Sequence, residues 1–364
     1  MLHRSFKLFC KIYLSLLTIS FVLYNGCSES DDPFPNATSQ NINSHQLAEA
    51  YEIARNIDGM RSLLLERNEV LVSEEYFNGV GPDDVYDVRS VTKSFTSALI
   101  GIAIEKGFIQ SVDETIADYF TNVEVDSLPE RKGNITIRQL LTMTCGMEWH
   151  ELGGYSEFSQ WVNSPDQINY IIAKPFTSVP GTHFNYSDGA AHLTSVILEE
   201  AVGMGTVDFA NQYLFNPLGL GEKTWWADNR GYNYGGVGLC VTPRDMIKFG
   251  RLYLNHGVYN GQQIIPVSWV NESTQTHIST NNVVPYGSSY GYYWWIANER
   301  GHYIFYATGY GGQFIFCVPD LNLVTVATCN WQNTGVHADE HWYAIIQMFM
   351  NNILPAVNPN YLIP

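Results

Sequence analysis

The stretch RSVTKSFTSAL, residues 89–99, places Ser90 and Lys93 three positions apart at the start of a helical pattern. The pattern continues to about Lys106 and stops at Gly107. A spacing of three puts both side chains on one face of a helix, within contact of each other. The positive end of the helix dipole stabilises negative charge on the serine oxygen and disfavours a protonated lysine. The stretch therefore predicts a serine nucleophile beside a lysine that can accept its proton.

The Ser-x-x-Lys spacing is weak evidence by itself. On the order of one such spacing arises by chance in a chain of this length and average composition. An ordinary helix start with an exposed lysine is the alternative interpretation. The rest of the sequence must therefore decide between the two.

Strand patterns occur near both ends of the chain, and helical patterns dominate between them. We expect an α+β fold, with an antiparallel sheet built from N- and C-terminal segments, flanking helices, and a mainly helical inserted subdomain at about 110–235. The predicted strands are 62–66, 70–77, 290–297, 302–307, 313–318 and 323–328. The predicted helices are 45–56, 90–106, 137–143, 165–173, 187–202, 207–214, 243–255 and 338–351.

The first 26 residues have the pattern of an export signal, with a basic start and an apolar stretch at 12–24 that is short for a membrane span. Cys27 follows Gly26 and precedes a polar stretch, which resembles a bacterial lipoprotein site. We expect an exported protein, anchored in the bacterial cell envelope through lipid on Cys27. Periplasmic or secreted protein without lipid, and a retained anchor, are the alternatives.

Composition divides the remaining chain into three parts. Residues 27–44 are rich in Asp, Asn, Ser and Pro and predict a flexible tether. Residues 45–355 carry the strand and helix patterns and predict the folded domain. Residues 356–364 are expected to form a C-terminal tail.

Charge narrows the range of partners. The formal net charge is -17, with 36 acidic against 19 basic residues. So acidic a chain disfavours nucleic acid and anionic membrane surfaces as partners. We expect contact with a membrane only through the signal or the lipid anchor.

Two further patterns concern metals and disulfides. The segment 337–341 matches the zinc-peptidase pattern His-x-x-Glu-His. We interpret it as the polar first turn of the terminal helix, because only 23 residues follow it, and we expect no metal. Four cysteines lie in apolar stretches without a Cys-x-x-Cys pair, so buried free thiols are expected, while a disulfide stays open. These cysteines are Cys145, Cys240, Cys317 and Cys329.

Five more segments extend the pattern of 89–99 in a fixed order along the chain: 140–147, 180–188, 242–246, 291–295 and 307–313. With them the chain resembles the β-lactamase-related serine hydrolases over roughly residues 45–355. That family includes class C β-lactamases, D-alanyl-D-alanine carboxypeptidases, esterases and 6-aminohexanoate-dimer hydrolases. Segment 180–188 resembles its Tyr-x-Asn element, and 307–313 lies where the family carries Lys/His-Thr-Gly.

The resemblance implies the chemistry of an acyl-enzyme. Ser90 would attack a carbonyl carbon, and Lys93 and Tyr186 would act as a coupled base. Tyr186 would then pass a proton to the leaving group and help to activate the deacylating water. No cofactor is implied.

The resemblance also implies how the substrate is held. The backbone N–H groups of Ser90 and Tyr310 would form the oxyanion hole. Asp188, Thr308 and Gly309 would contact the substrate. The expected substrate is a small ester, amide or peptide.

Two positions depart from the family pattern. Ala307 stands where the family has Lys or His, a cation implied to bind the substrate carboxylate in relatives that process β-lactams. We therefore expect an ester or amide without a carboxylate at that spot. Asp188 replaces a neutral amide. An ionised Asp188 near Lys93 would favour Tyr186 as the base, or it could meet an amine on the substrate.

The sequence leaves alternatives open. A β-lactamase or a D-amino-acid cell-wall peptidase is the second interpretation within enzymes. A catalytically silent module that binds wall peptides is an interpretation from another class of protein. Neither the substrate nor the oligomeric state follows from the sequence.

Overall fold

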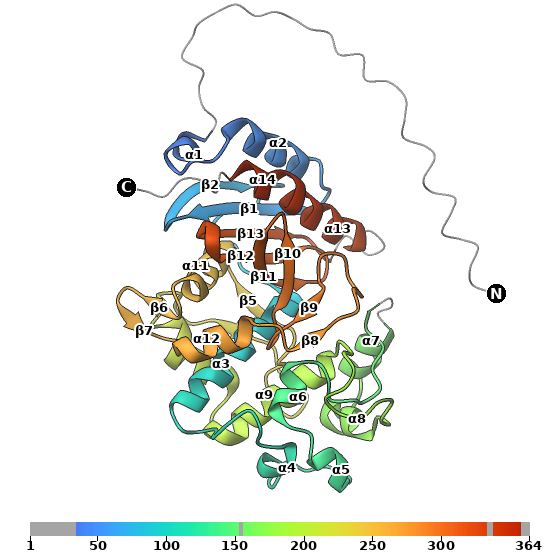
Figure 1. Cartoon of the computed structure of the whole chain (residues 1–364). Coiled ribbons are helices and arrows are strands. Elements are labelled where there is room, and N and C mark those ends of the chain that lie inside the picture. Colours follow the sequence, from blue (N-terminus) through green and yellow to red (C-terminus); the bar gives the residue numbers. More distant parts are fainter. Residues whose placement is uncertain (1–33, 153–155, 333–337, 358–364) are drawn as a thin grey trace, which may run out of the picture. The chain divides into compact units, whose positions relative to one another are not determined.

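The computed structural model describes residues 34–152, 156–332 and 338–357. Its centre is an antiparallel sheet of eight strands in the order β2-β1-β13-β12-β11-β10-β9-β8 (Figure 1). The strands are β1 (Met60–Arg67), β2 (Val70–Tyr76), β8 (Ile278–Ser279), β9 (Ser289–Tyr290), β10 (Trp295–Glu299), β11 (His302–Gly309), β12 (Gln313–Val318) and β13 (Leu323–Cys329). β1 pairs with β13, so the two ends of the chain build one sheet, as predicted.

The sheet is buried on both faces, and the alternation of side chains along β12 shows what covers each face. Phe316 stacks on Phe349 with ring centroids 3.9 Å apart, on the side of the C-terminal helices. On the other side, a Cβ atom at Gly250 would lie 3.0 Å from Ile315 and 3.4 Å from Cys317. A helix therefore approaches closely on that face, and glycine permits the approach.

The helices form layers on these two faces (Figure 1). One layer contains α2 (Ser44–Arg55), α13 (Ala338–Met348), the π-helical turn Phe349–Ile353 and α14 (Leu354–Ala356). The other contains α11 (Pro243–Leu254), which packs on β1, β12 and β13. Thr242 caps α11, because its hydroxyl accepts a hydrogen bond from the Asp245 N–H at 3.1 Å.

Helices and a small sheet make up the middle of the chain. Helix α3 (Thr92–Glu105) is almost entirely buried and packs against α9 and α12. The short strands β3 (Tyr86–Asp87), β5 (Leu239–Val241) and β4 (Thr224–Trp225) form a second sheet in that order. The helices are α4 (Ile116–Tyr119), α5 (Glu130–Gly133), α6 (Ile137–Leu141), α7 (Ser156–Val162), α8 (Gln167–Ala173), α9 (Asp188–Val202), α10 (Thr206–Ala210), the π-helical turn Asn211–Phe215 and α12 (Val267–Thr274); β6 (Val258–Tyr259) and β7 (Gln262–Gln263) form a hairpin.

The structure differs from the predicted tether and tail. Residues 34–44 are folded: Pro35–Ser39 form helix α1, and Ile42 makes a β-bridge with Val357. Phe34 and Ile42 are buried, so their apolar surface holds this segment on the domain. The predicted tail likewise begins too early, because Ala356 and Val357 are buried. The predicted signal and Cys27 lie outside the described residues.

One predicted strand is interrupted. The stretch 290–297 splits into β9 and β10, because Tyr293 has a φ of 61° and cannot continue an extended strand. Its backbone carbonyl accepts a hydrogen bond from the Ser94 hydroxyl at 2.7 Å, and its own hydroxyl contacts Thr194 at 2.7 Å. The break therefore ties the sheet to α3 and α9.

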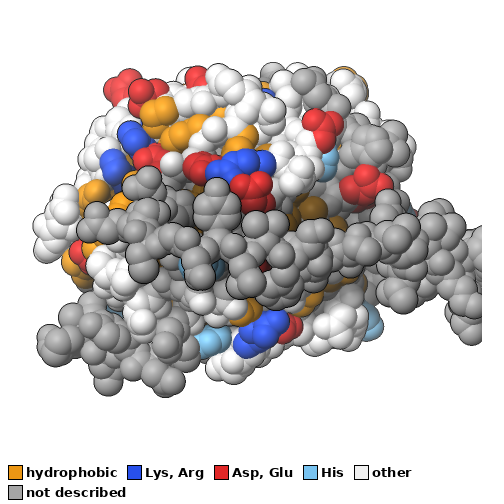
Figure 2. Space-filling model, turned by 90° about the horizontal axis from the view of Figure 1, so that it is seen from above, with side chains coloured by type: hydrophobic (Ala, Val, Ile, Leu, Met, Phe, Trp, Pro, Cys, Tyr) orange, Lys and Arg blue, Asp and Glu red, His pale blue; other side chains and the backbone are white. Residues whose placement is uncertain are grey.

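Within the described residues, Cys145, Cys240, Cys317 and Cys329 are free thiols. The same residues contain no group of three or more His, Cys, Asp or Glu side chains arranged to hold a metal, and no helix long and apolar enough to cross a membrane. His337 of the zinc-peptidase pattern lies outside the description. Figure 2 shows small groups of Lys and Arg beside Asp and Glu. Among the ion pairs of the described residues, Arg55 on α2 pairs with Glu52 and Glu75.

Candidate active site

Ser90 lies in a strained turn between β3 and α3. The residue before it, Arg89, has a φ of 51°, which is uncommon for a residue other than glycine. The buried Asp87 holds this conformation, because one carboxylate oxygen accepts the Arg89 N–H at 2.9 Å and the other lies 3.2 Å from Arg89 Nη1. Asp87 also accepts the Gly238 N–H at 3.0 Å. These contacts fix where the Ser90 hydroxyl points.

Lys93 lies one helical turn after Ser90, and the two side chains are on the same face of the helix, as the spacing predicts. Its Nζ donates to Ser90 Oγ at 2.9 Å and to the Gly236 carbonyl at 3.3 Å. It also forms an ion pair with Asp188, the first residue of α9. Only 1% of the Lys93 side chain and 3% of the Asp188 side chain are exposed to solvent. The pair is therefore shielded from water, which strengthens its electrostatic attraction.

Tyr186 belongs to the same cluster of side chains as Lys93. The Lys93 ammonium is 4.7 Å from the centre of its ring, and Tyr186 lines the same cavity as Ser90. The ring stacks on Trp295, with centroids 5.6 Å apart. Burial, and then the charges of Glu151 and Asp188, raise the pKa of Tyr186 well above its usual value. Tyr186 is therefore a neutral phenol at physiological pH and a potential proton donor.

Glycine makes room for the Lys93–Asp188 pair. A Cβ atom at position 236 would lie 2.5 Å from Asp188 Oδ1 and 3.2 Å from Lys93 Nζ. Any side chain there would displace the pair, so the glycine-rich stretch 235–238 lies directly against the site.

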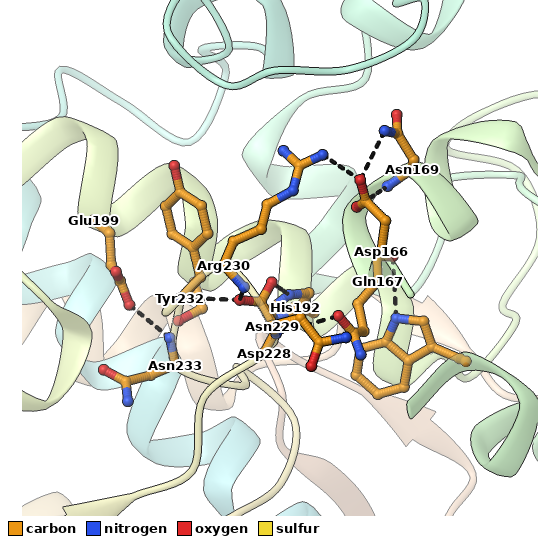
Figure 3. A network of polar contacts seen from close by, with 12 residues as sticks. Asp166, Gln167, Asn169, His192, Glu199, Asp228, Asn229, Arg230, Tyr232 and Asn233 are labelled. Atoms are coloured by element: carbon orange, nitrogen blue, oxygen red, sulfur yellow. Dashed lines mark hydrogen bonds and ion pairs between the residues drawn. The ribbon is translucent and has the colours of Figure 1, made fainter. Parts of the chain in front are cut away.

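A polar network anchors the loop that leads into this glycine stretch (Figure 3). Asp228 contacts His192 of α9 through Oδ2 at 3.0 Å and accepts the N–H groups of Arg230 and Tyr232 at 2.8 and 3.0 Å. The Asn233 N–H donates to Glu199 of α9 at 2.8 Å. The helix that presents Asp188 therefore also holds the loop that presents Gly236.

The end of β11 forms the opposite wall. Ala307 is buried in the strand, and the Thr308 hydroxyl accepts a hydrogen bond from Trp342 Nε1 of α13 at 2.6 Å. A Cβ atom at Gly309 would lie 2.5 Å from the Val88 carbonyl and 3.1 Å from Ser90 N. Glycine is thus required for β11 to lie directly against the Ser90 turn.

These walls enclose a cavity of about 710 Å³. The sequence prediction accounts for six of its lining residues: Ser90, Tyr186, Asp188, Thr308, Gly309 and Tyr310. Lys93 does not line the cavity but contacts Ser90 from behind. The structure therefore brings the predicted catalytic, oxyanion and substrate-binding residues together, whereas Cys27 lies outside the described part of the chain.

Sequence reasoning missed Glu151, which also lines the cavity. Its Oε2 accepts the Trp149 Nε1–H at 2.8 Å and the Asp188 N–H at 2.7 Å. Burial, and then the neighbouring charge of Asp188, raise the pKa of Glu151 above its usual range. No motif or periodicity marks this residue, because it lies in a loop and meets Asp188 across 37 positions of sequence.

Comparison with known proteins agrees with the fold. The family model described as beta-lactamase matches residues 45–348. This is most of the chain, and the protein belongs to the beta-lactamase family. The 6-aminohexanoate-dimer hydrolase of Paenarthrobacter ureafaciens is 24% identical over 309 residues, covering 78% of this chain and 74% of that protein.

Solved structures share the fold. The octameric penicillin-binding protein homologue from Pyrococcus abyssi aligns with a TM-score of 0.64 and 18% identity, over 86% of this chain and 78% of that one. EstCE1, a hydrolase with promiscuous acyltransferase activity, aligns with a TM-score of 0.66 and 16% identity, over 83% and 98%. The expected α+β fold is confirmed.

Proposed function

We propose that this protein is a serine hydrolase that cleaves an ester or amide bond through an acyl-enzyme on Ser90. The observation that carries the proposal is one continuous chain of contacts. Ser90 lines the cavity, its Oγ lies 2.9 Å from Lys93 Nζ, and Lys93 is paired with Asp188. Nucleophile, base and a group that orients the base are the arrangement that activates a serine.

In the proposed acylation, the proton of the Ser90 hydroxyl moves to Lys93 as Lys93 gives a proton to Asp188. The Ser90 oxygen then forms a bond to the carbonyl carbon of the substrate. The backbone N–H groups of Ser90 and Tyr310 are assigned to the developing oxyanion, because Gly309 keeps the end of β11 against the Ser90 turn.

Collapse of the tetrahedral intermediate breaks the bond to the leaving group, which needs a proton. Tyr186 is the proposed donor, since its raised pKa keeps it neutral and it lines the same cavity as Ser90. Lys93 lies over the Tyr186 ring and returns the proton. The same groups then take a proton from the water that hydrolyses the acyl-enzyme.

The charges around the cavity favour a neutral or amine-bearing substrate. Among the described residues that line it, Arg89 is the cationic side chain, and Arg89 is already paired with Asp87 at 3.2 Å. Four acidic side chains also line the cavity: Glu151, Asp188, Asp339 and Glu340. With Ala307 in place of a cation, a substrate carboxylate would meet repulsion rather than a partner.

The apolar side chains of the cavity indicate what kind of acyl group the substrate carries. Leu152, Val283 and Tyr343 are large hydrophobic residues that are exposed to solvent, and all three line the cavity. Trp295 and Trp342 line it as well. An apolar or aromatic acyl group would bury these surfaces on binding.

The test is hydrolysis of a short-chain p-nitrophenyl ester and a chromogenic cephalosporin, with the Ser90→Ala variant beside the wild type. We expect ester turnover that is lost in Ser90→Ala, with little cephalosporin turnover. Strong cephalosporin turnover would instead favour a β-lactamase. Ester turnover that survives in Ser90→Ala would contradict the proposed nucleophile.

A further inference from the structure

Glu151 is a partly buried ionisable group in the wall of the cavity that the proposed reaction does not use. Both N–H donors that reach its carboxyl group, from Trp149 and Asp188, bond to the same oxygen, Oε2. The Trp149 indole is fixed in turn. It is buried and packs on the first turn of α9, where a Cβ atom at Gly189 would lie 2.8 Å from the ring. The Glu151 carboxyl is therefore held in one place, at the start of α9.

The Glu151 carboxyl thus lies against the Asp188 backbone, and Asp188 is itself paired with a single cation, Lys93. Two carboxylates this close repel each other when both are ionised, which favours one proton held by the pair. Lys93 in turn contacts Ser90. The four residues thus form one chain of contacts, with two carboxyl groups at the end remote from Ser90.

The other ionisable groups that face this carboxyl pair are Lys93, Tyr186, Tyr290 and Tyr293. Burial raises the pKa of each of the three tyrosines above 10, so all three stay neutral across the physiological range. Like charges in contact cannot both ionise readily, so the second proton of a carboxyl pair leaves at a raised pH.

We propose that Glu151 is a positioning residue that stores, together with Asp188, the proton removed from Ser90. The inference rests on the proposed function, because it extends the path by one step. The Ser90 proton moves to Lys93, a Lys93 proton moves to Asp188, and the carboxyl pair holds it as the shared proton with Glu151. The pair accepts this proton only when it is fully ionised.

The proposal predicts how the rate depends on pH. Wild-type kcat/KM rises with pH along a limb that reports loss of the shared proton. Glu151→Gln keeps an acceptor oxygen for Trp149 and the Asp188 N–H, but cannot share a proton. In the kcat/KM profile of Glu151→Gln, the rising limb moves to lower pH by at least about one unit. The plateau value of kcat/KM also falls, since a single carboxylate beside an amide is a weaker base.

The experiment measures kcat/KM for the p-nitrophenyl ester from pH 5 to 10, with the Ser90→Ala rate subtracted as background. Each profile is normalised to its own plateau. One unit below the wild-type midpoint, the wild type retains about a tenth of its plateau, whereas Glu151→Gln retains at least about half. The matched control is Glu148→Gln in the same loop, where Glu148 contacts His150 at 3.2 Å and does not line the cavity. This control keeps the wild-type limb.

A second measurement does not depend on turnover. In protein labelled with 13C at the glutamate carboxyls, the signal that is missing in Glu151→Gln is assigned to Glu151 and followed through a pH titration of the Ser90→Ala protein. A midpoint well above the ordinary glutamate range supports the shared proton. An ordinary midpoint, or a Glu151→Gln limb that coincides with the wild type, overturns the proposal even if Ser90 proves to be the nucleophile. If Ser90→Ala retains activity, the proposed function fails, and the titration still decides the shared proton.

Discussion

Helix α9 carries two buried polar contacts one turn apart, each involving an aspartate, and they serve different purposes. Asp188 pairs with Lys93 beside a cavity, whereas His192 contacts Asp228 at 3.0 Å in a place where neither side chain is exposed. Asp228 is further bonded to two backbone N–H groups of its own loop (Figure 3). The first contact leads through Lys93 to the nucleophile Ser90, whereas the second leads only to backbone N–H groups of a loop. Burial and charge alone therefore do not mark a catalytic group; its connection to a cavity does.

The largest expected effect follows from breaking the first contact. We expect Lys93→Met to lower kcat/KM by about 10³-fold or more, because Ser90 loses the group that accepts its proton. The measurement is ester hydrolysis beside Lys248→Met, whose lysine donates to the Gly219 carbonyl at 3.0 Å, remote from the cavity lining. A Lys93→Met rate within tenfold of the wild type would exclude Lys93 as the base.

A smaller loss is expected when the pair is displaced rather than removed. In Gly236→Ala the new methyl group lies 2.5 Å from Asp188 Oδ1 in the unrelaxed structure, so Asp188 or the loop must move. We expect a fall in kcat/KM of about 10- to 100-fold, since misplacement of about 1 Å is costly to catalysis. Gly81→Ala is the control, because no atom lies within 4 Å of a Cβ there. Equal rates for the two variants would show that the pair tolerates movement.

Loss of the second contact, between His192 and Asp228, should affect stability more than activity. We expect Asp228→Ala to lower the free energy of unfolding by about 3–5 kcal/mol, because His192 and the loop N–H groups lose a buried partner. The folded fraction should keep kcat/KM within about tenfold of the wild type. Urea unfolding and active-site titration at a temperature below the transition separate the two quantities. If Asp228→Ala were as stable as the wild type yet inactive, the His192–Asp228 contact would also serve catalysis, and the two contacts would not differ in purpose.

Stability as a function of pH sharpens the comparison further. The pKa of Glu151 is raised in the folded protein, so at pH values above its unfolded pKa, near 4.3, the folded state holds a proton that the unfolded chain has released. Stability therefore falls as pH rises, by up to about 1.4 kcal/mol per unit, until Glu151 ionises in the folded state as well. Glu151→Gln should lack this decrease, and Glu148→Gln should keep it. Parallel curves for Glu151→Gln and the wild type between pH 5 and 8 would contradict the shift.

The sequence predicted those parts of the molecule that local spacing controls. Ser90 and Lys93 meet because a helix brings positions three apart onto one face, and the sheet of both chain ends follows from short apolar strands. Glu151 and Asp228 could not be predicted, since each meets α9 from a loop about 36 positions away. Arg89 gives no sign of its positive φ, which depends on Asp87 and the packed turn.

The predicted boundaries of the folded domain were wrong for a related reason. Residues 34–44 have the composition of a linker, yet Phe34 and Ile42 supply enough apolar surface to dock a short helix. Composition averages over a segment, whereas docking depends on the few side chains that find a complementary surface. A polar segment with two well-placed apolar residues is therefore easily mistaken for a tether.

The smallest expected effect concerns the charge at the cavity rim. Asp339 is exposed and lines the cavity, so it acts on a substrate through solvent and is screened by salt. We expect Asp339→Asn to lower kcat/KM for an amine-bearing ester about two- to threefold relative to a neutral ester of the same size, with the difference shrinking in high salt. Glu49→Gln makes the same change of charge on α2, away from the cavity, and should leave the ratio unchanged. A ratio that does not respond to Asp339→Asn at low salt would show that the rim carboxylates do not select the substrate, and would leave that role to the buried Asp188.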